Sequence, residues 1–209
     1  MNIKKVGILY HPMVEATLAK AKELESSSTM QGVAAWRCSS WEKEEIQTAL
    51  EGTDLILTVG GDGTILRAVQ AVIPGVTPIT GINQGKLGFL TELDAAEAIQ
   101  KLPLLFTGQG WLDERAMLQA ELVSQGQETC VFHALNDIVI ARGEIPRIIR
   151  VEAAIDGQPL TIFKTDALVV STATGSTGYA LAARGPVMHP RSRDILLVPV
   201  APHLCLSYL

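Results

Sequence analysis

The sequence predicts an α/β domain followed by an all-β domain. In residues 1–107, apolar runs of strand length alternate with amphipathic segments of helix length, which is typical of parallel strands joined by crossover helices. From residue 108 onward, β-branched runs alternate with polar residues, and helical periodicity is mostly absent. We therefore expect an α/β domain over 1–107, with a parallel sheet and flanking helices, and a β-rich domain over 108–209.

Composition supports two folded cores and excludes several classes of protein. The chain has 209 residues, of which 47% are hydrophobic, so it can form one large or two modest cores and is not mainly disordered. Its apolar runs stay well short of the roughly 20 residues that span a bilayer. The start, MNIKKVGILYHP, has too short an apolar stretch for a secretory signal. We expect a cytoplasmic protein with no membrane partner.

The net charge and the cysteine spacing indicate which further ligands and structural features are not expected. The formal net charge of −5 leaves no basic footprint for nucleic acid, which is bound by clustered Lys and Arg. An anionic ligand would therefore be held by local geometry, as backbone amides at a helix start can do. The three cysteines are widely spaced and outside any CxxC pattern. Neither a disulfide framework nor a zinc site is indicated.

Strands and helices are expected to alternate through the first domain. Residues 14–25 carry apolar side chains at helical spacing, and residues 54–59 form the short apolar run of a buried strand. Pro78 fits a strand only at an edge or at the strand's start, and Pro103 should end the preceding helix. The expected strands are 5–10, 32–38, 54–59 and 75–83, and the expected helices are 14–25, 41–50, 64–72 and 95–102.

The second domain is expected to consist of antiparallel hairpins. Its β-branched runs are separated by turn residues, and DGQP at 156–159 is a strong turn candidate. No period of 20 to 50 residues repeats, so the chain is not a repeat array. Strands are expected within 115–124, 128–143, 146–157, 158–166 and 167–172.

A glycine-rich loop, Gly60-Gly61-Asp62-Gly63-Thr64, joins an apolar strand to a helix. This geometry aims backbone N–H groups at an anion, and glycines leave no Cβ to keep a phosphate away. Thr64 is a candidate N-cap. The loop is neither a Walker A sequence nor GxGxxG. It therefore favours a phosphate site that differs from P-loop and ordinary dinucleotide-binding proteins.

Asp62 is the unusual residue of the loop, because anion binding alone does not favour a carboxylate there. A carboxylate near a helix start is favoured in its charged form, so Asp62 could accept a proton from a substrate hydroxyl. It could instead hold Mg²⁺ beside nucleotide phosphates. The alternative is a capping aspartate in an ordinary glycine turn.

Two further polar clusters interrupt the β-rich half. Residues 174–178, Thr-Gly-Ser-Thr-Gly, follow an apolar strand and precede a short helical segment that Pro186 stops. They suit a polar small molecule or form a simple ST-rich turn. Asn136 and Asp137 break an apolar run, and adjacent strand residues face opposite sides, so one of them must face solvent or a ligand. A bulge or a sheet edge is the alternative.

Together and in this order, these residues resemble the NAD kinase family, whose members transfer the γ-phosphate of ATP, or of polyphosphate, to the adenosine 2′-hydroxyl of NAD. The glycine loop alone is similar to loops of lipid kinases and 6-phosphofructokinases; its combination with the other clusters is far more specific. The matching positions are Gly60-Gly61-Asp62-Gly63-Thr64, Gly81-Ile82-Asn83, Gly85, Leu87-Gly88-Phe89-Leu90, Asn136-Asp137, Asp166, Thr174-Gly175-Ser176-Thr177, Tyr179, Gly185-Pro186, His189-Pro190 and Pro202-His203.

The resemblance implies an N-terminal α/β domain, a C-terminal β-sandwich-like domain and a site in the cleft between them. It implies a homo-oligomer that binds NAD and ATP, with a divalent metal ion, Mg²⁺, as cofactor and no dedicated protein metal ligands. Asp62 would be the general base. The implied nucleotide-binding positions are Gly60, Gly61, Gly63, Thr64, Arg67, Asn136, Asp137, Arg147, Lys164, Asp166, Thr174, Thr177, Gly178, Tyr179, Ala180, Leu181 and Ala182.

Departures from the family pattern keep other functions open. Arg184 stands where glycine is usual, and could obstruct a tight turn that needs positive φ. The apolar residues Leu204, Leu206 and Leu209 suggest a fragment whose continuation would complete the β domain, so we expect reduced stability and activity for this chain alone. Alternatives are an NAD(P)-binding protein without turnover and a kinase for another hydroxyl acceptor, such as a lipid or a sugar.

Overall fold

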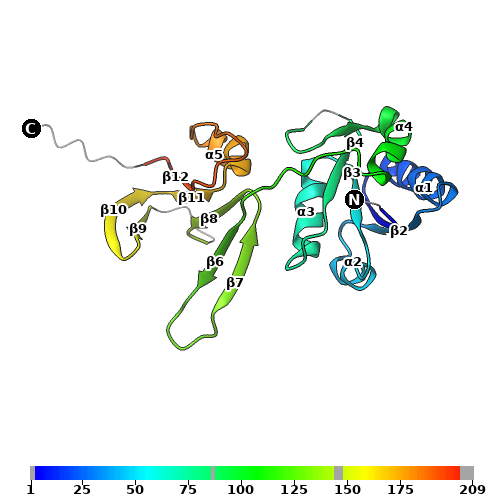
Figure 1. Cartoon of the computed structure of the whole chain (residues 1–209). Coiled ribbons are helices and arrows are strands. Elements are labelled where there is room, and N and C mark those ends of the chain that lie inside the picture. The colour runs from blue at the N-terminus through cyan, green and yellow to red at the C-terminus, as the bar shows by residue number, and fades with distance from the viewer. Residues whose placement is uncertain (1–2, 86–87, 144–147, 203–209) are drawn as a thin grey trace, which may run out of the picture. The chain divides into compact units, whose positions relative to one another are not determined.

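The computed structural model describes residues 3–85, 88–143 and 148–202. It divides into two compact units, Met1–Leu112 and Asp113–Leu209, which are described separately (Figure 1). The first unit is a parallel sheet with helices and the second is an antiparallel β-rich unit. The predicted fold class is therefore confirmed.

The first unit contains a five-stranded parallel sheet in the order β2-β1-β3-β4-β5. Helices α1 and α4 contact each other, as do α2 and α3, so each pair covers one face of the sheet (Figure 1). The strands are β1 (Lys5–Tyr10), β2 (Ala34–Ser39), β3 (Leu55–Gly60), β4 (Ile79–Asn83) and β5 (Leu93–Asp94). The helices are α1 (Glu15–Met30), α2 (Lys43–Ala49), α3 (Asp62–Val72) and α4 (Ala95–Phe106).

Strand β3 is buried along its whole length because helices cover both faces of the sheet. Leu57 and Val59 pack into the core formed with α1 and α4, whereas Ile56 packs into the core formed with α2 and α3. This explains why the strand is a continuous apolar run rather than an alternating one.

The order of the strands creates a switch point between β1 and β3. From β1 the chain moves outward to β2 and then returns to β3 on the other side of β1. In open α/β sheets, ligands bind beyond the carboxyl ends of the strands at such a point. Here β1 ends next to His11, and β3 ends in the glycine loop. The His11 N–H donates to the Val59 carbonyl at 3.2 Å, so the two ends are linked.

Pro78 and Pro103 are the two prolines of the first unit whose positions the sequence predicts. Strand β4 begins at Ile79, directly after Pro78, as the start-of-strand alternative requires. The prediction that Pro103 ends a helix is wrong, since α4 continues to Phe106. A proline inside a helix costs about 3 kcal/mol. Burial of Leu102 and Phe106 offsets this cost, at about 1.5–3 kcal/mol for each side chain.

The second unit is built from antiparallel pairs: β6 with β7, β9 with β10, and the three-stranded sheet β12-β11-β8. The turn predicted at 156–159 is formed by Asp156 and Gly157, with the positive φ that a tight hairpin turn requires, whereas Gln158 and Pro159 already belong to β10. The elements are β6 (Leu118–Leu122), β7 (Cys130–Ala134), β8 (Asp137–Ala141), β9 (Ile149–Ile155), β10 (Gln158–Thr165), β11 (Ala167–Ser171), the 3₁₀ helix η1 (Thr174–Thr177), α5 (Tyr179–Ala182) and β12 (Leu196–Val200).

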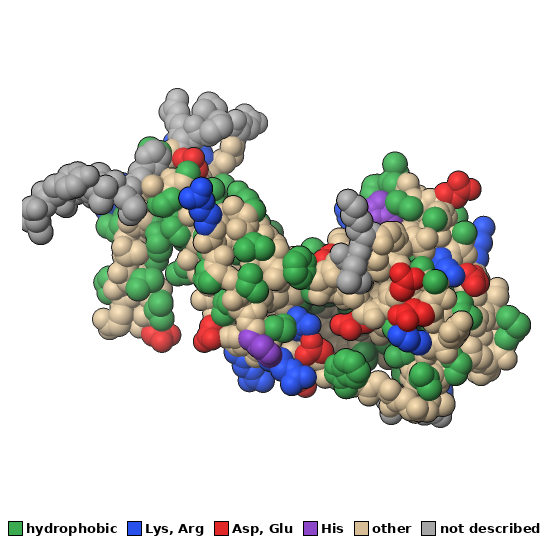
Figure 2. All heavy atoms as spheres, turned by 90° about the horizontal axis from the view of Figure 1, so that it is seen from above, with side chains coloured by type: hydrophobic (Ala, Val, Ile, Leu, Met, Phe, Trp, Pro, Cys, Tyr) green, Lys and Arg blue, Asp and Glu red, His purple; other side chains and the backbone are tan. Residues whose placement is uncertain are grey.

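Many apolar side chains of the second unit remain exposed (Figure 2). Leu204, Leu206 and Leu209, on which the expected exposed end rested, lie outside the described residues. Among the residues that the structure describes, no helix is long and apolar enough to cross a membrane. The exposed apolar residues on the strands are Leu122, Val131, Phe132, Val139, Ile140, Ile155, Leu160 and Ile162.

Arg184 occupies a left-handed position directly after α5, with φ of 66°. The turn forms despite the side chain: the Gly185 N–H donates to the Ala180 carbonyl at 2.8 Å, and the Arg184 N–H donates to the Leu181 carbonyl at 2.9 Å. This is the Schellman arrangement, in which glycine is the usual residue at the position of Arg184. The Arg184 side chain therefore does not obstruct the turn, but the positive φ of a non-glycine residue strains the backbone.

We expect Arg184→Gly to raise the free energy of unfolding by about 1 kcal/mol, because glycine adopts positive φ without a Cβ penalty. Arg184→Ala is the matched control, since it removes the charge but keeps the strain and should give no gain. Urea unfolding of the three proteins measures the difference. A glycine variant no more stable than the alanine variant would contradict a strained turn.

Candidate functional site

The glycine loop, residues 60–64, lies at the carboxyl end of β3. Helix α3 begins at Asp62, with Gly61 at the N-cap, so the prediction that Thr64 caps the helix is wrong. The reason is that the extended Gly61 backbone lets the helix begin two residues earlier. The Thr64 hydroxyl lies instead against Gly60, where it is buried without a hydrogen-bond partner among the described residues.

The glycines of this loop meet different needs. A Cβ on Gly60 would lie 2.3 Å from Thr64 Oγ1, so the fold itself requires glycine there. A Cβ on Gly61 or Gly63 would meet no described atom within 4 Å. Since the N–H groups of the first helical turn have no acceptor within a helix, the open space beside Gly61 and Gly63 suits an anion.

The Asp62 carboxylate is held by the segment that follows β4. The Phe89 N–H donates to Oδ2 at 2.9 Å, and the Leu90 N–H donates to Oδ1 at 3.0 Å. Each carboxylate oxygen can accept about two hydrogen bonds, so each keeps capacity for a further donor. Asp62 is thus oriented by the backbone and can still accept a proton from a substrate hydroxyl.

Gly88 makes this arrangement possible. A Cβ at this position would lie 2.1 Å from Asp62 Oδ1 and 2.6 Å from its carboxyl carbon. The backbone can approach the carboxylate only because the side chain is absent. The glycine at 88 and the aspartate at 62 therefore form one structural unit.

In the second unit, Leu135 and Asn136 form the bend between β7 and β8, and Asp137 follows as the first residue of β8. The expectation that Asn136 and Asp137 face opposite sides of one strand is wrong, because β7 ends at Ala134 and β8 begins at Asp137. A Cβ on Gly178 would lie 3.6 Å from Asn136 Nδ2 and 3.7 Å from Asp137 Oδ2. Both side chains therefore approach the same glycine.

The backbone at this bend is tied to the segment after β11 by Thr172. Its N–H donates to the Asn136 carbonyl at 2.9 Å, and its hydroxyl donates to the Leu135 carbonyl at 2.5 Å. The same hydroxyl accepts from the Gly175 N–H at 3.0 Å. A Cβ on Gly175 would lie 2.2 Å from the Asn136 carbonyl oxygen, so only glycine allows this approach.

The Asn136 cluster, which comprises Asn136, Asp137, Thr174 and Gly178, contains unsatisfied polar groups. Asn136 Oδ1 and Thr174 Oγ1 are buried with no hydrogen-bond partner among the described residues. Burial raises the pKa of the Asp137 carboxyl above its usual range. An unpaired buried polar group costs about 1–3 kcal/mol, so these groups suit a ligand that brings hydroxyl donors.

The other predicted site residues have different environments. Ala180 is buried, and its side chain packs into the small core with Val169 and Val198. Lys164, near the end of β10, is exposed, as is Asp166 at the bend before β11. Arg147 lies outside the described residues. Thr177 is half-buried, and the exposed members of α5 are Tyr179, Leu181 and Ala182.

Comparison with known proteins identifies the family. The model of the ATP-NAD kinase N-terminal domain matches residues 6–110, and that of the C-terminal domain matches residues 135–208. The chain belongs to the NAD kinase family. The NAD kinase of Dehalococcoides mccartyi strain BAV1 is 45% identical over 98% of this chain and 72% of the relative. That of Chloroflexus aggregans is 38% identical over 97% of this chain and 73% of the relative.

Solved NAD kinase structures share the fold. Yeast NADH kinase complexed with NADH matches with a TM-score of 0.87 and 27% identity, over all of this chain and 69% of that one. An NAD kinase from Archaeoglobus fulgidus in complex with ATP matches with a TM-score of 0.73 and 29% identity, over 96% of this chain and 74% of that one. The resemblance inferred from the sequence is therefore confirmed.

The NAD kinase fold brings Asp62 and Gly88 together over a sequence separation that local pattern does not reveal. The family resemblance matched Gly88, Phe89 and Leu90 but assigned them no partner. The backbone N–H groups of Phe89 and Leu90 orient the carboxylate, and such backbone contacts cannot be recognised from the side-chain pattern.

Other chemical groups of the chain do not compete for the role of Asp62. Burial, together with the neighbouring Glu45 carboxylate to which the thiol donates, raises the pKa of Cys38 to about 11, so this thiol stays protonated at neutral pH. No group of three His, Cys, Asp or Glu that could hold a metal ion occurs within 3–85, 88–143 and 148–202. The described residues fit a divalent ion that would be bound mainly by nucleotide phosphates. Asp62 is the carboxylate that the glycine loop itself contains.

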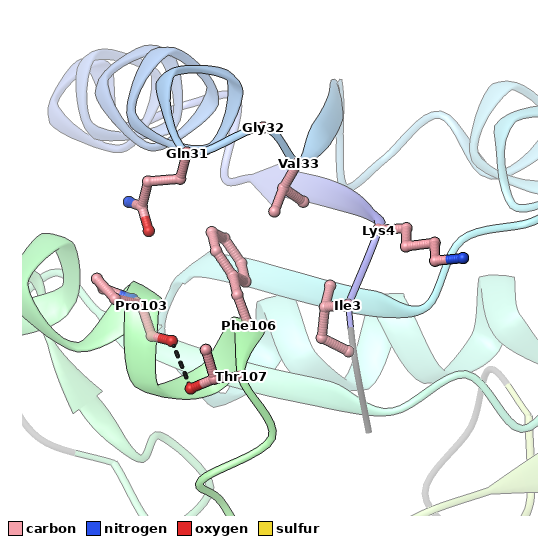
Figure 3. Close-up of a pocket in the computed structure, with 8 residues that line it drawn as sticks. All are labelled: Ile3, Lys4, Gln31, Gly32, Val33, Pro103, Phe106 and Thr107. Atoms are coloured by element: carbon pink, nitrogen blue, oxygen red, sulfur yellow. Dashed lines mark hydrogen bonds between the residues drawn. The ribbon is translucent and has the colours of Figure 1, made fainter.

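A shallow pocket of about 300 Å³ lies elsewhere in the first unit (Figure 3). Several of its residues directly precede β1 and β2, at the amino ends of the strands, whereas the glycine loop lies at the carboxyl ends. It is therefore separate from the candidate site. Its lining residues are Ile3, Lys4, Gln31, Gly32, Val33, Pro103, Phe106 and Thr107.

We expect Gly88→Ala to lower the free energy of unfolding by roughly 2 kcal/mol, because the new Cβ displaces the backbone that donates to the Asp62 carboxylate. Gly63→Ala is the control: its Cβ enters open space in a helix, where alanine is favoured, so stability should be unchanged or higher. Urea unfolding separates the two variants. Equal effects of both substitutions would refute the steric account.

We expect Asp137→Asn to raise stability at neutral pH. Burial raises the folded-state pKa of Asp137, so the wild type loses stability as pH rises from below the usual aspartate pKa through the raised value. Asparagine carries no such penalty. Thermal unfolding should show the variant above the wild type at pH 7, with the gap closing under acid conditions below about pH 4. A less stable variant at pH 7 would contradict the prediction.

Proposed function

We propose that the protein is an NAD kinase that transfers the γ-phosphate of ATP, or of polyphosphate, to the 2′-hydroxyl of the adenosine ribose of NAD. The observation that carries this proposal is the Asp62 carboxylate, fixed by two backbone N–H groups beside an open glycine loop. The open space beside Gly61 and Gly63 suits a phosphate. The oriented carboxylate beside it can accept the proton of a substrate hydroxyl.

The described residues include groups of the kind that phosphoryl transfer needs. This reaction depends on positioning and charge stabilisation more than on covalent help. The amides near Gly61 and Gly63 would hold phosphate oxygens, and Asp62 would accept the proton of the attacking hydroxyl. Mg²⁺ bound to the triphosphate would neutralise negative charge on the transferred group.

The Asn136 cluster would bind ribose hydroxyls of NAD. Asp137 and Asn136 Oδ1 accept hydrogen bonds, and the Thr174 hydroxyl can donate or accept. A sugar with several hydroxyls satisfies all three groups without introducing charge. Further nucleotide contacts are proposed for Gly60, Thr64, Arg67, Arg147, Lys164, Asp166, Thr177, Gly178, Tyr179, Ala180, Leu181 and Ala182, with Ala180 acting through its backbone.

A cytoplasmic homo-oligomer completes the proposal. Strands β6, β7, β9 and β10 expose apolar side chains, and contact with a second copy of the chain would bury such a surface.

Asp62→Asn tests the proposed chemistry. We expect kcat for NADP formation to fall by about 10²- to 10⁴-fold, the usual contribution of a general base. NAD binding should persist, because the substitution leaves the Asn136 cluster intact. The measurement is a coupled assay of NADP formation with ATP and with polyphosphate, alongside calorimetric titration of NAD.

A control is needed because the side-chain NH₂ of asparagine is a donor and would face one of the two backbone N–H donors. The backbone of Phe89 and Leu90 would then move away from residue 62. Gly88→Ala disturbs the same backbone but keeps the carboxylate, so it should lose less activity than Asp62→Asn. Near-normal turnover by Asp62→Asn would remove Asp62 from the mechanism. NAD binding by the wild type without NADP formation would favour a non-enzymatic nucleotide-binding protein, and phosphorylation of a lipid or sugar instead would redirect the acceptor.

A further inference from the structure

The guanidinium of Arg67 lies over the ring of Trp41, an exposed tryptophan to which none of the proposed roles is assigned. The guanidinium carbon of Arg67, on α3, lies 5.1 Å from the centroid of the Trp41 ring, within the range of a cation–π interaction. Trp41 follows β2 and is 46% exposed. What distinguishes Trp41 from the more exposed Trp111 is its contact with a cationic side chain on the helix that follows the glycine loop.

His11 connects this pair to the switch point of the sheet. The rings of His11 and Trp41 meet edge to face, with centroids 5.9 Å apart and an angle of 70°. The backbone of His11 is fixed against β3 by its hydrogen bond to the Val59 carbonyl, and its Nδ1 accepts from the Met13 N–H at 3.2 Å. Trp41 is therefore supported at the carboxyl edge of the sheet, where ligands of this fold class bind.

Among the described residues, no carboxylate neutralises the charge of Arg67. No carboxylate forms an ion pair or hydrogen bond with its side chain in the part of the chain that the structure describes. A cation–π contact with a ring face uses none of the conventional hydrogen-bond acceptors, so N–H groups of the guanidinium stay available for an anion. The arrangement resembles a phosphate-binding arginine that has been oriented in advance.

The position of Arg67 on α3 matches this interpretation. Gly63 and Arg67 are four residues apart on one helix, so they share a face. Gly63 borders the open space of the glycine loop. A phosphate at the helix start and the guanidinium of Arg67 therefore lie along the same side of α3.

We propose that Trp41 is a positioning residue, which holds Arg67 so that its N–H edge meets a phosphate of a nucleotide bound at the glycine loop. This inference rests on one part of the proposed function, namely that the ligand is a nucleotide. Arginine is long and flexible, and ordering it on binding costs affinity. The contact with Trp41 orders the Arg67 side chain before the ligand binds. The gain should therefore appear in nucleotide affinity rather than in the rate of the chemical step.

The test compares Trp41→Leu, which removes the aromatic face, with Trp41→Phe, which keeps one. Calorimetry on the full-length protein should show about two- to fivefold weaker binding of NAD or of ATP for the leucine variant, the loss expected for one exposed cation–π contact. The phenylalanine variant should be close to the wild type. The corresponding KM should rise with kcat unchanged.

Two controls isolate the pair. Trp111→Leu makes the same chemical change at a tryptophan that is 80% exposed, and it should not alter nucleotide binding. In an Arg67→Gln background, Trp41→Leu should have no further effect, because the positioned group is already gone. Thermal unfolding of each variant shows whether a loss of affinity merely follows a loss of stability.

The outcomes distinguish the sources of the phosphate and the two proposals. A change confined to NAD assigns Arg67 to the dinucleotide, and a change confined to ATP assigns it to the donor; either supports positioning. Equal losses for the leucine and phenylalanine variants, a loss that persists without Arg67, or unchanged affinity would overturn it. Because binding is read without turnover, a wild type that binds nucleotide but forms no NADP would refute the kinase proposal while leaving the Trp41 comparison valid.

Discussion

The contact between the Asp62 carboxylate and two backbone N–H groups is the constraint on which the candidate site depends. It ties the loop after β3 to the segment after β4, so the end of one strand and the connection beyond the next take up one arrangement. Hydrogen bonds to a charged acceptor are worth about 1.5–3 kcal/mol each, enough to fix both loops. The carboxylate is thereby aimed before any substrate arrives, which is the condition that positional catalysis requires.

The polar groups of the candidate site differ between the two units in whether the protein satisfies their hydrogen bonds. Asp62 is satisfied by the protein, whereas Asn136 Oδ1 and Thr174 Oγ1 are buried without partners among the described residues, and burial disfavours the charged form of Asp137. A group that must abstract a proton benefits from a fixed orientation. Groups that must recognise hydroxyls benefit from being left unpaired, since a ligand lacking those hydroxyls would leave them unsatisfied and bind poorly.

Sequence periodicity predicted the alternation of strands and helices because both faces of the parallel sheet are covered and the buried runs are continuous. It identified Asp62, Asn136 and Asp137 because polar residues stand out against apolar strands. It failed where distant segments meet. The Asp62 contact spans 27 residues, the extension of α4 through Pro103 depends on core burial, and the shared direction of Asn136 and Asp137 depends on a bend that local pattern reads as a strand.

The glycines show why a motif and its physical cause must be separated. Gly60 and Gly88 are required by the protein itself, since a Cβ on either would overlap the side chain of Thr64 or Asp62. They would be needed even if no ligand bound. Gly61 and Gly63 face open space, so the unliganded fold does not explain their lack of side chains. The argument for a bound phosphate therefore depends on this second pair, and the argument for a base depends on the first, because Gly88 is what lets the backbone orient Asp62.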